Sequence, residues 1–150
     1  MQAQILEKSA SFKTRFGEVA YDEAKVLSFP NGILGMPNQG KFFVSPFPSD
    51  KMDKFQVLQS LVDTEVSFAL VPLAVLNNLI EDADLDEVRQ VLEMSKEDML
   101  VMLIVSIQKT PSGARLSVNV RAPLFIDTAS KTGYQIVLAN SKYPVQHFLG

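Results

Sequence analysis

One stretch decides the fold class, and it reads MLVMLIVSIQKTPSGARLSVNVR over residues 99–121. Its first ten residues are apolar at almost every position, which is typical of a central strand that is covered on both faces. The last seven residues alternate between polar and apolar side chains, as in a strand with one buried face. Gly113 lies between the two runs and can supply the positive φ that a hairpin turn needs. The stretch therefore predicts an antiparallel hairpin.

Proline and glycine punctuate the rest of the chain, and the runs between them are rich in Val, Ile, Phe and Leu. These runs are about five to nine residues long, which is the length of a strand. A second hairpin is expected where residues 128–133 separate residues 124–127 from residues 134–138, and a further turn is expected at residues 30–32. Many short strands at even spacing favour a closed or nearly closed sheet. We therefore expect a mainly β protein, built as a small antiparallel β-barrel.

One segment has a helical pattern instead. Apolar residues recur at helical spacing from Leu85 through Val91 to residue 92. Asp84 is placed as the N-cap of this helix and Glu87 as its N3 residue, the arrangement of a capping box. The sequence therefore predicts one short acidic helix, inserted into the barrel around residues 84–94.

Length and composition are those of one globular domain spanning residues 1–150, with 47% hydrophobic and 21% charged residues. The chain has no cysteine, which excludes a disulfide scaffold, a thiolate zinc site and a cysteine nucleophile. The longest apolar run, residues 99–107, is about half of the roughly 20 residues that a membrane-spanning helix needs. The N-terminal MQAQILEK lacks the features of a signal peptide. We therefore expect a cytoplasmic protein without a membrane segment.

The acidic residues are concentrated in one place. Residues 81–98 carry eight acidic and two basic residues, whereas the rest of the chain carries nine acidic and 12 basic ones. The simpler interpretation is a solvated helix face, because acids are favoured near a helix N-terminus. The alternative is a negative patch that meets a basic protein partner, since the net charge of −3 disfavours direct binding of nucleic acid. Its candidate partner-binding residues are Glu81, Asp82, Asp84 and Asp86.

The aromatic residues offer a second candidate surface. Phe42 and Phe43 are neighbours, and neighbours on a regular strand point to opposite faces, so both cannot enter one core. Core packing is the simpler interpretation for the aromatic residues as a group. The alternative is that Phe42, Phe43 or Phe47 is an exposed anchor for another protein.

Catalytic groups are sparse. His147 is the single histidine, and the sequence contains no nucleophile elbow and no glycine-rich phosphate loop. Asp63 and Glu65 are a possible hydrolase pair, but no motif supplies an oxyanion hole or a metal. We therefore expect no enzymatic activity, no cofactor and no metal. A small-molecule-binding barrel is the alternative function, and its candidate polar groups are Gln59, Asn119, Arg121 and Gln135.

Six blocks along the chain form a pattern: TRFGEV (14–19), FPNGILGM (29–36), FQVLQS (55–60), LSVNVRAPL (116–124), GYQIVL (133–138) and YPV (143–145). In content, order and spacing the pattern resembles the family of the flagellar assembly factor FliW. The chain departs from the family at Val71, which stands in an acidic place, in residues 73–78 and in residues 146–148. The residues that match the family motifs are Phe16, Gly17, Phe29, Gly32, Gly35, Gln59, Ser60, Asn119, Ala122, Pro123, Gln135 and Tyr143.

The resemblance implies a small antiparallel β-barrel without enzymatic activity, monomeric when free, that binds two protein partners. These are CsrA, an RNA-binding translational regulator, and flagellin. In the implied cycle, free flagellin occupies the protein, and released CsrA blocks the translation of flagellin. After flagellin is exported, the protein captures CsrA again and translation resumes. The resemblance implies a mainly allosteric antagonism of CsrA, with no direct contact to nucleic acid and no membrane contact.

Overall fold

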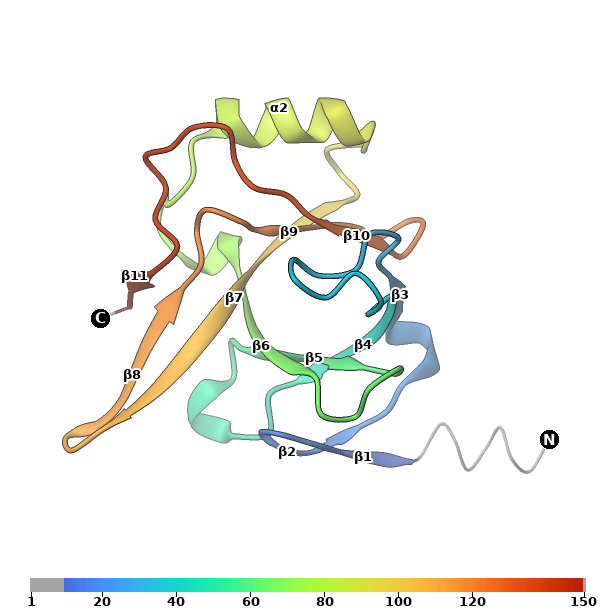
Figure 1. The fold of residues 1–150 in the computed structure, drawn as a ribbon, viewed down its shortest axis with the longest axis vertical. Coiled ribbons are helices and arrows are strands. Elements are labelled where there is room, and N and C mark those ends of the chain that lie inside the picture. Colours follow the sequence, from blue (N-terminus) through green and yellow to red (C-terminus); the bar gives the residue numbers. More distant parts are fainter. Residues whose placement is uncertain (1–9, 150) are drawn as a thin grey trace.

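The computed structural model describes residues 10–149, so the segment examined for a signal peptide lies outside the described residues. Within this range a strongly curled sheet is flanked by a small hairpin on one side and by one α-helix, α2, on the other (Figure 1). None of the helices in this range is long and apolar enough to cross a membrane. Short 3-10 helices join the strands: η1 (Glu23–Lys25), η2 (Asp50–Met52) and η3 (Leu73–Val75).

A ring of hydrogen-bonded strands forms the centre of the molecule. The ring runs in the order β7-β6-β5-β4-β3-β10-β9 and closes because β9 pairs back onto β7. The expected barrel is therefore present, and its pairs are antiparallel except β3–β10, which is a single parallel pairing of Ser28 with Thr132. The strands of the ring are β3 (Val26–Ser28), β4 (Lys41–Pro46), β5 (Gln56–Ser60), β6 (Ser67–Pro72), β7 (Met99–Thr110), β9 (Leu124–Asp127) and β10 (Thr132–Gln135).

The predicted hairpin of residues 99–121 is confirmed, and its first strand serves two purposes. Residues 99–102 of β7 pair with β9 and close the ring, whereas residues 105–110 pair with β8 (Gly113–Val118) outside it. Gly113 has a φ of +126°, as the turn requires. The strand β8 ends at Val118, three residues earlier than the alternation suggests, and its outer edge pairs with β11 (His147–Phe148).

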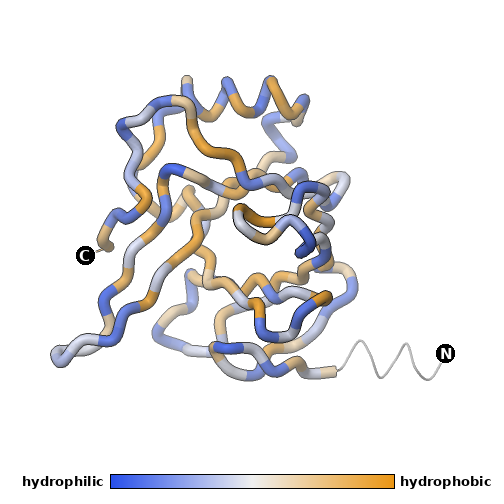
Figure 2. The backbone as a smooth tube through the Cα atoms, viewed as in Figure 1, coloured by the Kyte–Doolittle hydropathy of each residue, from blue (hydrophilic) through white to orange (hydrophobic). Residues whose placement is uncertain are grey.

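Both faces of the ring are covered by apolar side chains, and hydrophobic residues are concentrated along its strands (Figure 2). Phe42 points into the ring beside Phe29, with ring centroids 5.3 Å apart. Phe43 points outward and is covered by the hairpin of β1 (Ser11–Thr14) and β2 (Gly17–Ala20). It makes edge-to-face contacts with Phe12 and Tyr21, at 5.2 and 5.0 Å.

The prediction of an exposed aromatic anchor is therefore wrong for Phe42 and Phe43, which are both fully buried. The prediction assumed a single hydrophobic core, but β4 lies between two clusters of buried side chains, one inside the ring and one under the β1–β2 hairpin. Phe47 is half-buried and packs 5.2 Å from Phe16 and 6.4 Å from Phe55, so it too is mainly a packing residue.

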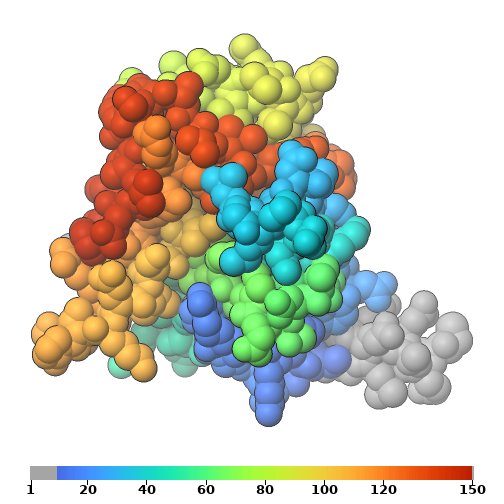
Figure 3. All heavy atoms as spheres, in the orientation of Figure 1, coloured from blue at the N-terminus to red at the C-terminus, as the bar shows by residue number. Residues whose placement is uncertain are grey.

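The segment of residues 29–40 closes one end of the ring, and in Figure 3 it covers the front of the barrel. Phe29 and Ile33 from this segment are buried among the inward-facing side chains. The predicted turn at residues 30–32 is present, with the Gly32 amide donating to the carbonyl of Phe29 at 2.9 Å. Gly32 has a φ of +66°, and a Cβ atom there would lie 2.3 Å from the carbonyl oxygen of Met36. Only glycine fits this turn.

The acidic helix α2 spans Asp82–Leu92, so its existence is confirmed but its predicted beginning is wrong. The N-cap is Glu81, whose side chain makes no capping hydrogen bond, and Asp84 lies inside the first turn. The helix ends at Glu93, which has a left-handed φ of +55°. Val88 faces the core, but Val91, expected on the same face, is 76% exposed.

Candidate functional site

The beginning of α2 is fixed to the C-terminal part of the chain by one tyrosine. The hydroxyl of Tyr143 donates a hydrogen bond of 2.5 Å to Oδ2 of Asp84 and accepts one of 3.0 Å from the backbone N–H of Glu81. Burial raises the pKa of Tyr143 to about 12, and the hydrogen bond and the charge of Asp84 act in the same direction. Tyr143 is 4% exposed, so it connects the two parts of the chain from a buried position.

The four acidic candidates do lie together at this end of α2, but three of them have partners within the protein. Asp84 is held by Tyr143, Glu81 forms an ion pair with Lys142, and Asp86 lies 3.4 Å from Nε of Arg89. Among the described residues, Asp82 has no hydrogen bond or ion pair from its exposed side chain. The negative charge of the first turn is therefore partly neutralised.

Unpaired negative charge lies further along the helix. The side chains of Glu87 and Glu93 are exposed and, like that of Asp82, make no ion pair with any described residue. The sequence assigned Glu87 to a capping box and did not single out Glu93. The capping assignment failed because the N-cap lies three residues earlier than predicted.

A shallow apolar groove runs between α2 and the segment of residues 136–139 that follows β10, and Figure 3 shows these two parts side by side. The groove has a volume of about 120 Å³, and its most exposed apolar residues are Val91 and Val137, at 76% and 50%. Exposed valines on facing elements leave apolar area that a partner can cover. We call this feature the α2 groove, and it is lined by Glu87, Val88, Val91, Leu92, Ile136, Val137 and Ala139.

The four polar groups proposed for a small-molecule site do not converge. Gln59 is fully buried and donates to the carbonyls of Ser60 and Thr64, at 2.9 and 3.2 Å. Asn119 lies in the connection after β8, and its side-chain oxygen accepts a hydrogen bond of 3.1 Å from the backbone N–H of Ala122.

The other two members of this set also bind backbone. Gln135 donates to the carbonyl of Ala122 at 3.1 Å and accepts from the amide of Leu34 at 2.8 Å. Arg121 donates to the carbonyl of Ser141 at 3.3 Å. All four therefore stabilise loops and strand ends.

The residues considered for catalysis are also structural or isolated. Asp63 accepts from the amide of Glu65 at 2.9 Å within the exposed turn between β5 and β6. His147 lies in β11 and pairs with Val118. Within residues 10–149, no three His, Cys, Asp or Glu side chains are placed to hold a metal ion together.

The sequence that forms the barrel, the covering hairpin and the external helix matches a known family. A family model described as FliW protein matches residues 11–149. This chain belongs to the FliW family. Relatives include the flagellar assembly factor FliW of Bacillus pumilus, 33% identical over 89% of this chain and 90% of the relative. The flagellar assembly factor FliW of Syntrophus aciditrophicus is 31% identical over 89% of this chain and 83% of the relative.

A solved structure agrees with the FliW fold. The crystal structure of the flagellar assembly factor FliW superimposes with a TM-score of 0.70 over 93% of this chain and 96% of the other, at 21% sequence identity. The relatives named here are described as assembly factors, and none of these descriptions names an enzyme.

The residues that the sequence predicts to match the motifs of the FliW family are spread over the molecule and mostly shape it. Gly17 and Gly35 have positive φ in tight turns, and Ser60 accepts from the amides of Val62 and Asp63, at 3.0 Å each. Two further residues of this set are Ala122, which is buried, and Pro123, whose carbonyl accepts a hydrogen bond from the backbone N–H of Ile136. The remaining residues of the set are packed or bind backbone groups, as described above.

The burial of Val71 suits an apolar side chain at the position where the resemblance leads us to expect an acidic one. Val71 is 1% exposed and belongs to the outer core with Leu103 and Val88. An unpaired carboxylate at such a position would carry a large desolvation cost, so the valine is consistent with its surroundings in this chain.

Proposed function

We propose that this member of the FliW family binds the translational regulator CsrA and flagellin, and thereby couples the translation of flagellin to its export. Membership of a family of flagellar assembly factors supports a role in the assembly of the flagellum. The observation that carries the proposal is the combination of unpaired acids and exposed valines along α2. A surface of this kind suits binding to a protein rather than catalysis.

The charge of α2 suits a basic partner. A protein that binds RNA presents positive charge to the phosphates. Asp82, Glu87 and Glu93 have no ion pair with another residue of the range 10–149 that would have to break before such a partner is met. Complementary charge speeds the encounter of two proteins, and negative charge beside the bound regulator repels the RNA backbone.

The α2 groove suits an apolar side chain from a partner helix. An amphipathic helix binds by laying its apolar face into a groove, with anchors at helical spacing. Val91 and Val137 offer apolar contact on the two sides of the groove, and Glu87 lies at its edge. CsrA and flagellin both offer terminal helices, so one groove could receive each in turn.

The experiment uses purified full-length protein with CsrA and flagellin from the same organism. Stopped-flow association with CsrA is measured for the wild type and for E87K/E93K, at several salt concentrations. The matched control is D50K/D53K, which makes the same change of charge at two exposed residues, one in η2 and one directly after it. We expect E87K/E93K to slow association by about tenfold and to flatten its salt dependence, with the control close to the wild type.

Two results would contradict the proposal. One is the absence of any complex with CsrA or with flagellin at micromolar concentrations, where a Kd of about 1 μM corresponds to about −8.2 kcal/mol. The other is CsrA that keeps its full affinity for RNA in the presence of excess protein. Equal association rates for E87K/E93K and the control would remove α2 from the binding surface.

A further inference from the structure

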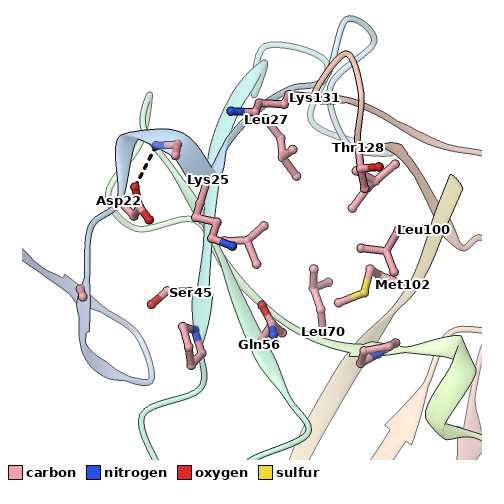
Figure 4. A pocket seen from close by; sticks show the side chains of 16 residues that line it. Asp22, Lys25, Leu27, Ser45, Gln56, Leu70, Leu100, Met102, Thr128 and Lys131 are labelled. Carbon is pink, nitrogen blue, oxygen red and sulfur yellow. Dashed lines mark hydrogen bonds between the residues drawn. The ribbon is translucent and has the colours of Figure 1, made fainter. Parts of the chain in front are cut away.

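The end of the ring opposite the segment of residues 29–40 opens into a cavity of about 700 Å³. This volume lies within the range of roughly 300–1,000 Å³ that is usual for small-molecule sites. Figure 4 shows side chains from several strands pointing into it. The cavity shares no residue with the α2 groove, so the inference drawn from it is independent of the proposed function.

The wall of the cavity is apolar because alternate residues of each strand face the inside of the ring. Leu70 and Met102 are buried deep in this wall, whereas Leu100 is 38% exposed near the mouth. A hydrocarbon chain would cover apolar area here, and the side chains of Ser45, Gln56 and Thr128 add polar atoms to the lining. The apolar side chains that line the cavity from the strands of the ring include Leu27, Val44, Leu70, Leu100, Met102 and Ile126.

Two exposed lysines line the cavity, one at each end of β3. Lys25 is the last residue of η1, directly before β3, and Lys131 precedes β10, with its carbonyl accepting from the Ser28 amide at 2.9 Å. Both side chains line the cavity, are exposed and have no ion pair with a described residue (Figure 4). The one lining carboxylate, Asp22, accepts from the Ala24 amide at 2.9 Å.

We propose that the mouth of the ring binds a single-chain aliphatic carboxylate. The tail lies among the apolar side chains inside the ring, and the carboxylate accepts charge-assisted hydrogen bonds from Lys25 and Lys131. Two free ammonium groups beside an apolar cavity select an anion with an apolar tail. A cationic head would meet two like charges, and a bulky polar ligand would leave its polar groups unpaired inside the ring.

The test is isothermal titration of the full-length protein with dodecanoate below its micelle-forming concentration. Dodecyltrimethylammonium carries the same tail with the opposite charge, and phosphatidylglycerol vesicles offer the alternative source of an anionic amphiphile. The variants are K25E/K131E, which reverses both rim charges, and V44F, which fills the cavity from β4. The matched control K96E/K109E makes the same change of charge on exposed lysines outside the cavity.

We expect saturable binding of one dodecanoate per chain, weakened at least tenfold in K25E/K131E and in V44F and unchanged in K96E/K109E. The cationic amphiphile should bind at least tenfold more weakly. The proposal is overturned by the absence of saturable binding, by equal binding of both amphiphiles, or by equal losses in K25E/K131E and the control. Binding to vesicles without binding of free dodecanoate would also overturn it and would assign the lysines to a lipid surface. The rim lysines are exposed, so K25E/K131E tests the site even if V44F does not fold.

Discussion

The hydroxyl of Tyr143 should make a measurable contribution to stability, and Y143F removes it with little change in packing. The hydroxyl makes one hydrogen bond to the Asp84 carboxylate and one to the Glu81 amide. The hydrogen bond to the charged Asp84 carboxylate contributes about 1.5–3 kcal/mol. The hydrogen bond from the Glu81 N–H adds little, because Glu81 is exposed and water can replace the Tyr143 hydroxyl there. We therefore expect Y143F to lower the free energy of unfolding by about 2 kcal/mol, a fall in Tm of roughly 4–8 °C for a domain of this size.

The assay is urea unfolding followed by far-UV circular dichroism, applied to a double-mutant cycle of Y143F and D84N. If the two groups interact directly, the double variant should lose about 1 kcal/mol less than the sum of the single losses. A loss below about 0.5 kcal/mol in Y143F, the usual range for a surface substitution, would refute the reasoning. Strict additivity of Y143F and D84N would refute it as well.

Three further predictions concern the same molecule. Because the pKa of Tyr143 is raised from 10.0 to about 12, the unfolded state loses this proton first, so its stabilising effect should be complete below pH 10 and lost between about pH 10 and 12. Urea titrations across that range should show a steeper fall of stability with pH for the wild type than for Y143F. G32A should lower the free energy of unfolding, measured in urea, by about 1–3 kcal/mol or more, because the positive φ of Gly32 and the nearby Met36 carbonyl both oppose a side chain. G35A should lower it by only about 1–2 kcal/mol, because Gly35 has a positive φ but open space around it. F43A should destabilise as strongly as F42A, by about 3–5 kcal/mol each, and a surface-like loss of under 1 kcal/mol for F43A would contradict its placement under the hairpin.

The parts of the fold that could be predicted from sequence are those fixed by neighbouring residues. The hairpin of β7 and β8 follows from a long apolar run, a glycine turn and an alternating run, all within residues 99–121. The turn at residues 30–32 depends on local backbone geometry in the same way. Such features need no knowledge of distant contacts.

The parts that could not be predicted depend on contacts between distant segments. Phe43 is buried because the hairpin of β1 and β2 covers the outer face of β4. The alternation of side chains along β4 does not indicate whether another segment covers that face. Asp84 looks like an N-cap in isolation, but its carboxylate is taken by Tyr143, 59 residues further along the chain. The cavity likewise depends on the pairing of β7 with β9, which closes the ring around lining residues from six of its strands.

The closure of the ring also bears on self-association. An open sheet ends in strands whose free N–H and C=O groups can pair with another copy, which is a common route to aggregation. Here the pairing of β9 with β7 turns what would be a long open edge into an internal ladder. The outer edge of β8 is shortened by β11, and the Arg115 guanidinium lies 3.6 Å from the Phe148 ring beside it. Fewer backbone N–H and C=O groups of the large sheet are therefore left free to pair with a second copy of the chain.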